Sequence, residues 1–400
     1  AMAKEIEGQT LRDYGNRKKR YRKIRKSIIG TLLVAIIAVV GIYLYLLYNK
    51  SYESYEVIKT EEALETDASG YLGYAGGLIK YSRDGAVAIN KDGSMLWNGS
   101  YEMMDPIADT CGKYVVIADR GNKLIHIFNE KGFVSSITTL YDIMKVEIAS
   151  QGVVAVLMEE GDTSYIKLYY EDGTVVSDSN EDGVLSEIIT NVGDAGYPID
   201  IALSDDGKKL VVSFLSFTTG KLVSTIGFYN FGEVGQNVID RFVGGFEFED
   251  IIVPEVAFLG NDTVCVYKEN GYSLFSMPEK PELLKEETLD KKIQSIIYNE
   301  KYFGWILEGT DSAPKQILLY DLAGKKVLDQ LLDFEYDKVL LSGEEIILYD
   351  NLSCLILKTN GKEKFRYTFD TNIEAIYPIN QLDKYYLVNA NGISQIQLVE

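Results

Sequence analysis

A long apolar stretch near the start of the chain is its first clear pattern. Residues 28–48 contain no charged side chain, and Tyr43, Tyr45 and Tyr48 cluster at the C-terminal end of the stretch. As a helix this stretch would be about 31 Å long, close to the roughly 30 Å of hydrocarbon in a bilayer. The tyrosines match the aromatic belt of a membrane interface. A cleaved signal peptide has a shorter apolar core followed by small residues, so we predict an uncleaved transmembrane helix over residues 28–48.

The remainder of the chain shows the alternation that is typical of strands. From residue 70 onwards, short β-branched and aromatic runs alternate with Gly, Asp and Asn turns, which predicts an all-β domain. One apolar strand recurs at first-residue spacings of 37, 38, 57, 54, 39, 43 and 40. Its eight copies are GLIKYS, YVVIAD, GVVAVLM, KLVVSFL, TVCVYKE, YFGWILE, EIILYD and YYLVN.

This repeat predicts a β-propeller over residues 49–400. A four-stranded unit of about 40 residues is typical of a propeller blade, because sheets stacked in a ring bury faces that a single sheet leaves exposed. We interpret the recurring strand as the inner strand of each blade. Eight copies favour eight blades. Seven blades are the alternative, but they would need about 49 residues each, more than five of the seven spacings.

Turns and chain ends support a closed ring. A second series of strands ends in a glycine turn, at Gly93, Gly132, Gly173, Gly232, Gly324 and Gly361, where glycine would supply the positive φ of a bulged hairpin. A further strand follows these turns, for example TVVSDS from Thr174. The last blade stops one strand short at Glu400. We predict that YEVIKT, within the tether of residues 49–70, supplies the missing outer strand.

Two insertions interrupt the repeat, and the second contains the candidate partner-binding segment. Residues 178–198 predict a loop or a short helix over residues 184–191. In the second insertion, residues 232–254, the stretch GGFEFED places two aromatic rings on one face of an extended chain and acids on the other. It can be an ordinary outer strand, or an aromatic anchor with an acidic rim for a protein or basic-peptide partner. The candidate residues are Phe246, Glu247, Phe248, Glu249 and Asp250.

Charge is divided unevenly along the chain and sets the predicted topology. Residues 1–27 hold ten Lys and Arg against three acids, whereas residues 49–400 hold 30 basic and 57 acidic side chains. By the positive-inside rule, residues 1–27 form a basic cytoplasmic segment and the propeller lies outside the cytoplasm, held in the cell membrane by one helix. The strongly acidic propeller argues against nucleic acid as a partner.

No set of residues indicates a catalytic or cofactor site. The three cysteines fall in three different predicted blades, and we interpret them as small strand residues: Cys111, Cys265 and Cys354. His126 lies in the predicted strand KLIHIFN. One histidine supplies neither a zinc site nor a redundant catalytic triad. Acids in predicted turns are explained by hydrogen bonds to the backbone, with Ca²⁺ binding as the minor alternative, at Asp92, Asp172, Asp205 and Asp206.

Several stretches resemble known propellers. IALSDDGKKL, from Ile201, resembles the blade motif of TolB-like and WD40-like propellers, and GAVAINKDGSMLW, from Gly85, is similar to a quinoprotein-like blade. The chain has only Trp97 and Trp305 and no adjacent cysteines, which departs from the quinoprotein pattern. From about residue 10 to the end, the layout resembles a family of bacterial membrane proteins known as a domain of unknown function. The stretches that carry this resemblance are GLIKYSRDG, YNFGEVGQN, VGGFEFED and GKEKFRYTF.

Together these patterns predict an interaction protein rather than an enzyme. The resemblance implies a propeller outside the cytoplasm and brings no catalytic residues. We therefore expect a scaffold or sensor at the cell envelope, with an envelope protein or a cell-wall polymer as partner. The alternatives are binding of a small ligand or glycan, and a quinoprotein-like enzyme that uses the central channel.

Overall fold

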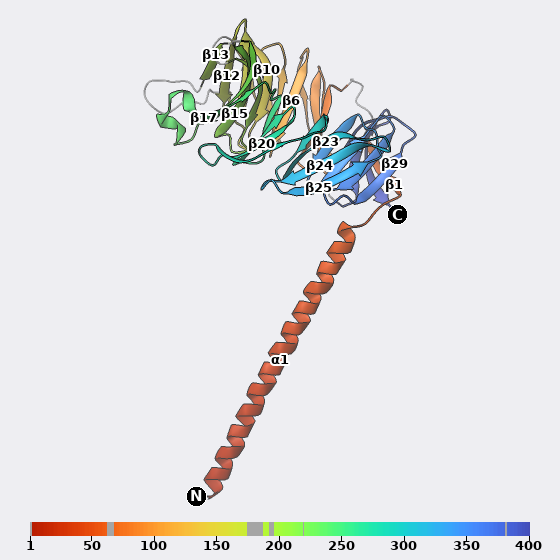
Figure 1. Ribbon diagram of the computed structural model, residues 1–400. Helices are drawn as coiled ribbons and strands as arrows, with labels where there is room; N and C mark the ends of the chain where they lie inside the picture. Colours follow the sequence, from red (N-terminus) through yellow and green to blue (C-terminus); the bar gives the residue numbers. More distant parts are fainter. Residues whose placement is uncertain (1, 62–67, 174–186, 192–195, 219, 381) are drawn as a thin grey trace. The chain divides into compact units, whose positions relative to one another are not determined.

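The computed structural model of the chain describes residues 2–61, 68–173, 187–191, 196–218, 220–380 and 382–400. It divides into two compact units, of which the first ends at Ser51 and the second is Tyr52–Glu400. The first unit is one helix, α1 (Met2–Tyr48), and the second is a β-propeller (Figure 1). Each unit is described separately below.

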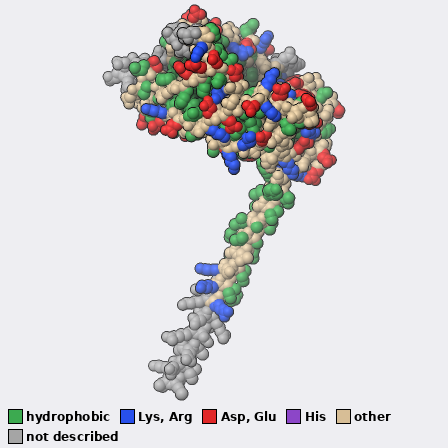
Figure 2. Space-filling model, viewed as in Figure 1, with side chains coloured by type: hydrophobic (Ala, Val, Ile, Leu, Met, Phe, Trp, Pro, Cys, Tyr) green, Lys and Arg blue, Asp and Glu red, His purple; other side chains and the backbone are tan. Residues whose placement is uncertain are grey.

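Helix α1 is apolar on all sides over its C-terminal half. Its segment Lys23–Tyr48 is long enough to cross a membrane, and the most apolar 18-residue window within it has a mean hydropathy of 2.6 and is not buried by protein. Figure 2 shows the hydrophobic side chains along this segment and Lys and Arg side chains at the end nearer the N-terminus. A helix that is hydrophobic all round needs a protein core or a bilayer to cover it. Because protein does not cover this window, the segment is a candidate membrane anchor. The helix is longer than the predicted 28–48, since Lys, Arg and Glu before residue 28 also favour helix.

The second unit contains eight antiparallel sheets of four strands in its described part, and the strands of seven of them follow one another in the chain. The first four blades are blade 1, β2 (Gly70–Tyr74), β3 (Gly77–Tyr81), β4 (Gly85–Ile89) and β5 (Met95–Ser100); blade 2, β6 (Pro106–Cys111), β7 (Tyr114–Asp119), β8 (Leu124–Asn129) and β9 (Gly132–Thr138); blade 3, β10 (Asp142–Ile148), β11 (Val154–Glu160), β12 (Thr163–Tyr169) and β13 (Glu187–Asn191); and blade 4, β14 (Tyr197–Leu203), β15 (Lys209–Thr218), β16 (Lys221–Asn230) and β17 (Phe242–Glu249).

The other four blades continue the same order until the last one, which takes its fourth strand from the start of the unit. They are blade 5, β18 (Glu255–Phe258), β19 (Thr263–Lys268), β20 (Gly271–Ser276) and β21 (Glu282–Thr288); blade 6, β22 (Ile293–Tyr298), β23 (Tyr302–Thr310), β24 (Ala313–Asp321) and β25 (Lys326–Leu332); blade 7, β26 (Lys338–Ser342), β27 (Glu345–Tyr349), β28 (Ser353–Lys358) and β29 (Glu363–Thr368); and blade 8, β30 (Ile373–Pro378), β31 (Lys384–Asn389), β32 (Gly392–Val399) and β1 (Ser54–Glu61). Eight blades, rather than seven, are therefore confirmed.

The recurring apolar strand is the second strand of each blade, and its assignment as the inner strand is wrong. All six residues of β7 are buried, as are the five of β27. A second strand has partners on both edges and a neighbouring blade on each face, so it reads as a continuous apolar run. The innermost strands, such as β6, β10 and β14, contact one another around the ring and are more polar.

The hydrophobic core lies between the blades. Eight clusters of buried side chains occupy the eight interfaces between neighbouring blades. The cluster between blades 8 and 1 includes Leu78 and Val87 of blade 1 and Tyr386 and Val388 of blade 8. The ring is therefore closed by packing as well as by strand pairing.

Strand β1 completes blade 8, in the position predicted for YEVIKT. It runs antiparallel to β32, with Tyr55 opposite Leu398 and Glu61 opposite Ile393. The Tyr55 ring lies 5.2 Å from the Tyr367 ring and 5.1 Å from the Phe369 ring, measured between centroids. Both partners belong to the blade 7 side of the interface, so β1 joins blades 7 and 8 as well as the two ends of the unit.

The predicted glycine turns and the first insertion have different outcomes. Gly93 has φ +82° and Gly361 has φ +86°, and the strand pairs at these turns carry the register shift of a bulge, whereas Gly232 does not have a positive φ. In the first insertion, the prediction of a loop or a short helix over residues 184–191 is wrong for residues 187–191, because these residues form β13. Ile188 and Thr190 are buried and Ile189 is exposed, which is the period-2 pattern of a strand. The predicted strand TVVSDS lies outside the described residues.

We predict that Tyr55→Ala destabilises the propeller by about 2 kcal/mol, because it removes a partly buried ring from the closing strand. The matched control is Ile58→Ala in the same strand, since Ile58 is 50% exposed. Thermal unfolding followed by near-ultraviolet circular dichroism measures both. Equal effects of the two substitutions would contradict a stabilising role for the Tyr55 contacts.

Candidate functional site

Two cavities lie near the starts of the inner strands, at the face of the ring that we call the channel mouth. The first cavity has a volume of about 470 Å³ and is lined by blades 2, 3 and 4. The second cavity has a volume of about 520 Å³ and is lined by blades 7, 8 and 1. Register shifts at Met144 in β10, Ile199 in β14 and Glu374 in β30 coincide with lining residues of these cavities. A β-bulge re-aims a side chain and is frequent beside functional sites.

Charged side chains of the inner strands link consecutive blades beside the first cavity. The Lys145 ammonium forms an ion pair with Asp200, lies 3.1 Å from a Glu147 carboxylate oxygen, and donates a hydrogen bond of 3.0 Å to the carbonyl of Ile201. Asp109 accepts a hydrogen bond of 2.8 Å from the backbone N–H of Ile148. The links therefore run from blade 2 to blade 3 and from blade 3 to blade 4.

Asp200 also links blade 4 to blade 5. The second Asp200 oxygen accepts a hydrogen bond of 2.8 Å from the backbone N–H of Val256. Glu255 precedes Val256 on β18, and the Tyr298 hydroxyl of blade 6 interacts with it. We call Asp109, Lys145, Glu147, Asp200 and Glu255 the carboxyl cluster, which contains four acids and one lysine.

The electrostatics of the carboxyl cluster favour protonation of its acids. Burial raises the pKa of Asp109 to about 6 and, together with the nearby Asp109 charge, raises the pKa of Glu147 to about 8. Burial also raises the pKa of Asp200 and of Glu255. Burial lowers the pKa of Lys145, but Glu147 and Asp200 outweigh it, so this pKa is raised and the lysine stays charged. Perturbed carboxyl groups beside a cavity are typical of functional sites.

The second cavity is lined by aromatic side chains instead. Tyr71 of β2, Tyr81 of β3, Tyr349 of β27 and Tyr377 of β30 all contribute to its wall. The polar side chains beside them are Ser69, Lys338, Asn351 and Glu374. This wall therefore combines tyrosine rings with hydrogen-bonding groups of both kinds, and its exposed lining is more polar than apolar.

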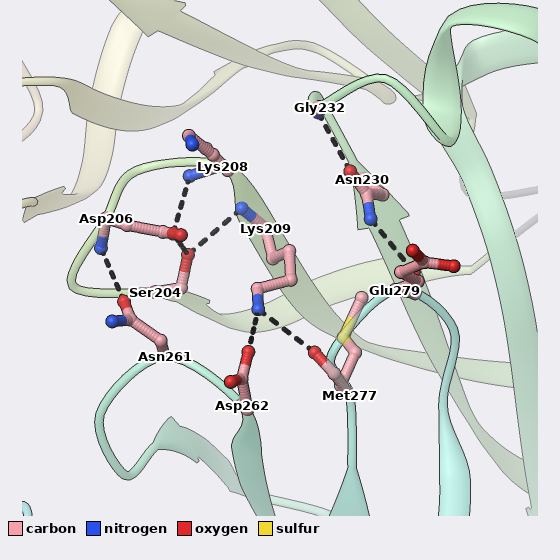
Figure 3. A network of polar contacts seen from close by, with 10 residues as sticks. All are labelled: Ser204, Asp206, Lys208, Lys209, Asn230, Gly232, Asn261, Asp262, Met277 and Glu279. Atoms are coloured by element: carbon pink, nitrogen blue, oxygen red, sulfur yellow. Dashed lines mark hydrogen bonds and ion pairs between the residues drawn. The ribbon is translucent and has the colours of Figure 1, made fainter.

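The motif SDDGKKL forms a joint between blades 4 and 5, as Figure 3 shows. The Asp206 carboxylate accepts hydrogen bonds from the Ser204 hydroxyl at 2.7 Å and from the Lys208 backbone N–H at 3.1 Å. Its own N–H donates to the Asn261 side-chain oxygen at 2.8 Å. Lys209 extends to Asp262 and donates to the carbonyl of Met277 at 3.0 Å. These contacts give the motif a structural role, as expected for an acid in a turn.

Asp92 behaves in the same way in blade 1. Its carboxylate accepts a hydrogen bond of 2.8 Å from the backbone N–H of Ser94. Within the described part of the chain, no group of three or more His, Cys, Asp or Glu side chains is arranged to hold a metal ion.

The candidate partner-binding segment lies on β17, the outer strand of blade 4. Phe246 packs 4.7 Å from Phe275 of blade 5 between ring centroids, and the Phe248 ring lies 5.1 Å from the Lys268 ammonium. Both rings are half-buried. Glu247, Glu249 and Asp250 are exposed, and Glu249 forms an ion pair of 2.7 Å with Lys221. The two-faced alternation is thus present. Partner binding by these five residues stays a prediction, in which the acids are more accessible than the rings.

Two exposed apolar residues lie close to this segment in the chain, and the sequence pattern did not predict them. Ile239, in the short 3-10 helix Ile239–Arg241, is 86% exposed, and Phe242 is 42% exposed. Ile239 lies in a single short turn and Phe242 is the first residue of β17, so no regular pattern before them indicated which side chains are exposed.

The remaining candidates have structural surroundings. His126 lies in β8 against the rings of Tyr101 and Phe133, at 5.6 and 5.7 Å, and burial lowers its pKa. Cys265 and Cys354 are buried, Cys111 is half-buried, and all three are free thiols. The interpretation of the cysteines as strand residues agrees with these positions.

Sequence reasoning missed the carboxyl cluster. Its members are one or two polar residues within each of the short strands that precede a recurring apolar strand, in PIADTC, DIMKVEI, YPIDIAL and EVAF. The available signal was a polar residue at a similar place in consecutive repeats. It became visible only once these strands were known to be the innermost ones.

The fold and the channel-mouth geometry define the class of this protein as an eight-bladed β-propeller preceded by a candidate membrane helix. The chain belongs to the family of unknown function DUF5711, which matches residues 48–398. No curated protein matches the chain.

Solved structures with similar folds are distant in sequence. BamB from Moraxella catarrhalis is 14% identical with a TM-score of 0.49, covering 86% of this chain and all of that one. A eukaryotic initiation factor is 12% identical with a TM-score of 0.48, covering 85% and 92%. The β-propeller domain of Cps50 (Swd1) from Myceliophteria thermophila is 9% identical with a TM-score of 0.46, covering 78% and 98%. Likeness at this level adds nothing to what the structure of this chain itself shows.

We predict that the carboxyl cluster makes the propeller less stable as pH rises. Asp109 and Glu147 bind protons more tightly in the folded than in the unfolded chain, so stability falls as pH passes from about 5 through 8. Glu147→Gln removes one titrating group, and the difference in melting temperature between pH 5.5 and pH 8.5 should shrink by about 2–4 °C. Calorimetry of the full chain in detergent checks this.

Glu308→Gln provides the control for this pH series, since Glu308 is an exposed carboxylate on blade 6. It should leave the difference between the two pH values unchanged. A Glu147→Gln chain with the same pH dependence as the wild type would contradict the assignment of the shift to Glu147.

Proposed function

We propose that this protein is a single-pass membrane protein whose propeller stands outside the cytoplasm and serves as an interaction scaffold or sensor at the cell envelope. The candidate membrane helix and the charge difference on its two sides support this topology. Ten Lys and Arg precede the apolar segment, and the propeller that follows is strongly acidic. The basic end is retained in the cytoplasm under the positive-inside rule.

The observation that carries the interaction role is the pair of buried acids that line the first cavity. Asp109 and Glu147 line this cavity beside Lys145 and Arg120, and burial raises the pKa of both acids. A further positive charge beside these acids would favour their ionised forms. A Lys or Arg side chain of a partner would supply that charge. We therefore propose a protein partner that presents a basic side chain to the channel mouth.

A second contact region is proposed at the outer edge of blade 4. Glu247, Glu249 and Asp250 give it acidic groups, and the exposed Ile239 and Phe242 give it apolar area close by in the chain. An apolar centre with a charged rim is the usual composition of a protein interface. The larger part of the binding energy in such an interface comes from a few buried apolar or aromatic anchors.

The proposed topology predicts the labelling of single cysteines in intact cells. Ser100→Cys, on the exposed end of β5, should react with a membrane-impermeant maleimide, whereas Arg20→Cys should react only after the membrane is permeabilised. Wild-type chain reports the background from the half-buried Cys111. The reverse labelling pattern would overturn the proposed orientation.

The proposed partner is tested by cross-linking in intact envelopes. The double variant Asp109→Asn with Glu147→Gln should lose a specific cross-linked protein, because its cavity no longer offers carboxylates to a basic side chain. The exposed control Glu308→Gln should keep that cross-link. A cross-link pattern unchanged in the double variant would refute the role of the carboxyl cluster, and a cofactor that co-purifies with the chain would favour the enzyme alternative.

A further inference from the structure

The second cavity combines fixed aromatic rings with hydrogen-bonding groups in one wall. It is lined by three blades, and its 520 Å³ falls within the roughly 300–1,000 Å³ of small-ligand pockets. Four tyrosines contribute to the wall, at positions 71, 81, 349 and 377. They come from β2, β3, β27 and β30, so regular strands rather than loops hold most of the aromatic surface.

Glycines of β2 make room for two of these rings. A Cβ at Gly70 would overlap the Tyr81 ring, and a Cβ at Gly73 would lie 3.4 Å from the Tyr377 ring. The rings therefore lie directly over the β2 backbone. Glycine inside a strand often marks such a close approach.

Hydrogen bonds fix the polar side of the wall before any ligand arrives. The Tyr71 hydroxyl donates to a Glu374 carboxylate oxygen at 2.8 Å, and the Tyr377 hydroxyl donates to the carbonyl of Tyr71 at 2.8 Å. The Lys338 ammonium donates to the carbonyl of Glu374 at 3.0 Å. Glu374 is the residue at the β30 bulge, and its side chain is exposed. Such fixed groups lower the ordering cost of binding.

The composition of the wall restricts the ligand class. An apolar ligand would cover Lys338, Asn351 and Glu374 without replacing their hydrogen bonds to water, which is costly. The Glu374 carboxylate would repel an anion, and the Lys338 ammonium would repel a cation. A neutral ligand with an apolar face and a rim of hydroxyl groups satisfies both the rings and the polar side chains. Sugar rings have this character, since their C–H faces pack on aromatic rings and their hydroxyls donate and accept hydrogen bonds.

We propose that the second cavity binds a neutral glycan segment of about one or two sugar rings. Tyr71 and Tyr81 supply stacking surface, and Glu374, Asn351 and Lys338 hydrogen-bond the hydroxyl groups. This site is formed by blades 7, 8 and 1 and shares no residue with the carboxyl cluster, so it stands or falls independently of the proposed protein partner.

Titration of the full chain with two neutral disaccharides, cellobiose and N,N′-diacetylchitobiose, tests this proposal. The detergent must carry no sugar headgroup, for example lauryldimethylamine oxide, because a glycosidic detergent would compete. Saturation-transfer difference NMR detects contact, and calorimetry gives the affinity. At least one disaccharide should bind saturably at one site. Failure of both to bind at about 10 mM would overturn the proposal, since affinity weaker than this supplies less than about 3 kcal/mol.

Two substitutions in the wall and one matched control locate the site. Glu374→Gln and Tyr71→Phe should each weaken binding about tenfold, as expected for a lost hydrogen bond to a charged or fixed group. Tyr197→Phe is the control, because Tyr197 lines the first cavity and its hydroxyl donates to Glu159 at 2.6 Å in the same kind of pair. It should change affinity less than twofold.

The variants also separate this proposal from the proposed function. Asp109→Asn with Glu147→Gln should leave disaccharide affinity unchanged, and Glu374→Gln should leave the protein cross-link unchanged. Unaltered melting temperatures of Glu374→Gln and Tyr71→Phe exclude misfolding as the cause of weak binding. Affinity equal to wild type in both wall variants, or loss of affinity in Tyr197→Phe alone, would place any sugar binding elsewhere and refute the proposal.

Discussion

The structure depends on burial of both faces of each sheet by its neighbours. A single four-stranded sheet leaves its second strand, such as β7 or β27, covered at the edges but open at the faces. Stacking in a ring covers these faces, and the resulting eight clusters contain most of the large apolar side chains of the propeller. Because every blade uses two neighbours, the ring needs its last interface, between blades 8 and 1, as much as any other.

The inner edge of the ring obeys a different constraint. The innermost strands have one edge without a partner strand, and some of their polar side chains bridge to the next blade, as Asp109 and Asp200 do toward backbone N–H groups. These bonds hold the inner edges in register. Glu147 makes no such bond to a neighbouring backbone N–H in the described structure, and its burial disfavours its charged form. Ionisation of Glu147 therefore lowers the stability of the inner edge.

The sequence could predict the elements that repeat with a strong apolar pattern. The eight second strands, the glycine turns such as Gly93 and Gly361, and the closing strand at Tyr55 follow directly from period-2 alternation and turn chemistry. The same apolar pattern led to the wrong assignment of the second strand as the inner strand. The apolar content of a strand predicts that the strand is buried, but it does not predict the position of the strand in the ring. Strand β13 was hidden because it follows an insertion rather than a glycine turn.

The candidate sites were harder to predict than the fold. GGFEFED was a candidate binding segment because its aromatic and acidic residues alternate. An outer strand with one packed face requires the same alternation, and Phe246 lies on that packed face. The two cavities arise from residues far apart in the chain, for example Tyr71 and Glu374. Their meeting depends on ring closure, which no local pattern contains.

Closure by β1 also sets an order of events during synthesis. The strand that completes blade 8 is the first of the propeller to leave the ribosome, and its partner β32 is the last. At about 5–20 residues per second, β1 waits roughly 20–70 s for that partner. During this interval blades 1 to 7 can assemble one on another, while an unsatisfied edge strand stays next to the candidate membrane segment. A chaperone that shields residues 54–61 would protect the nascent chain from pairing with the wrong strand.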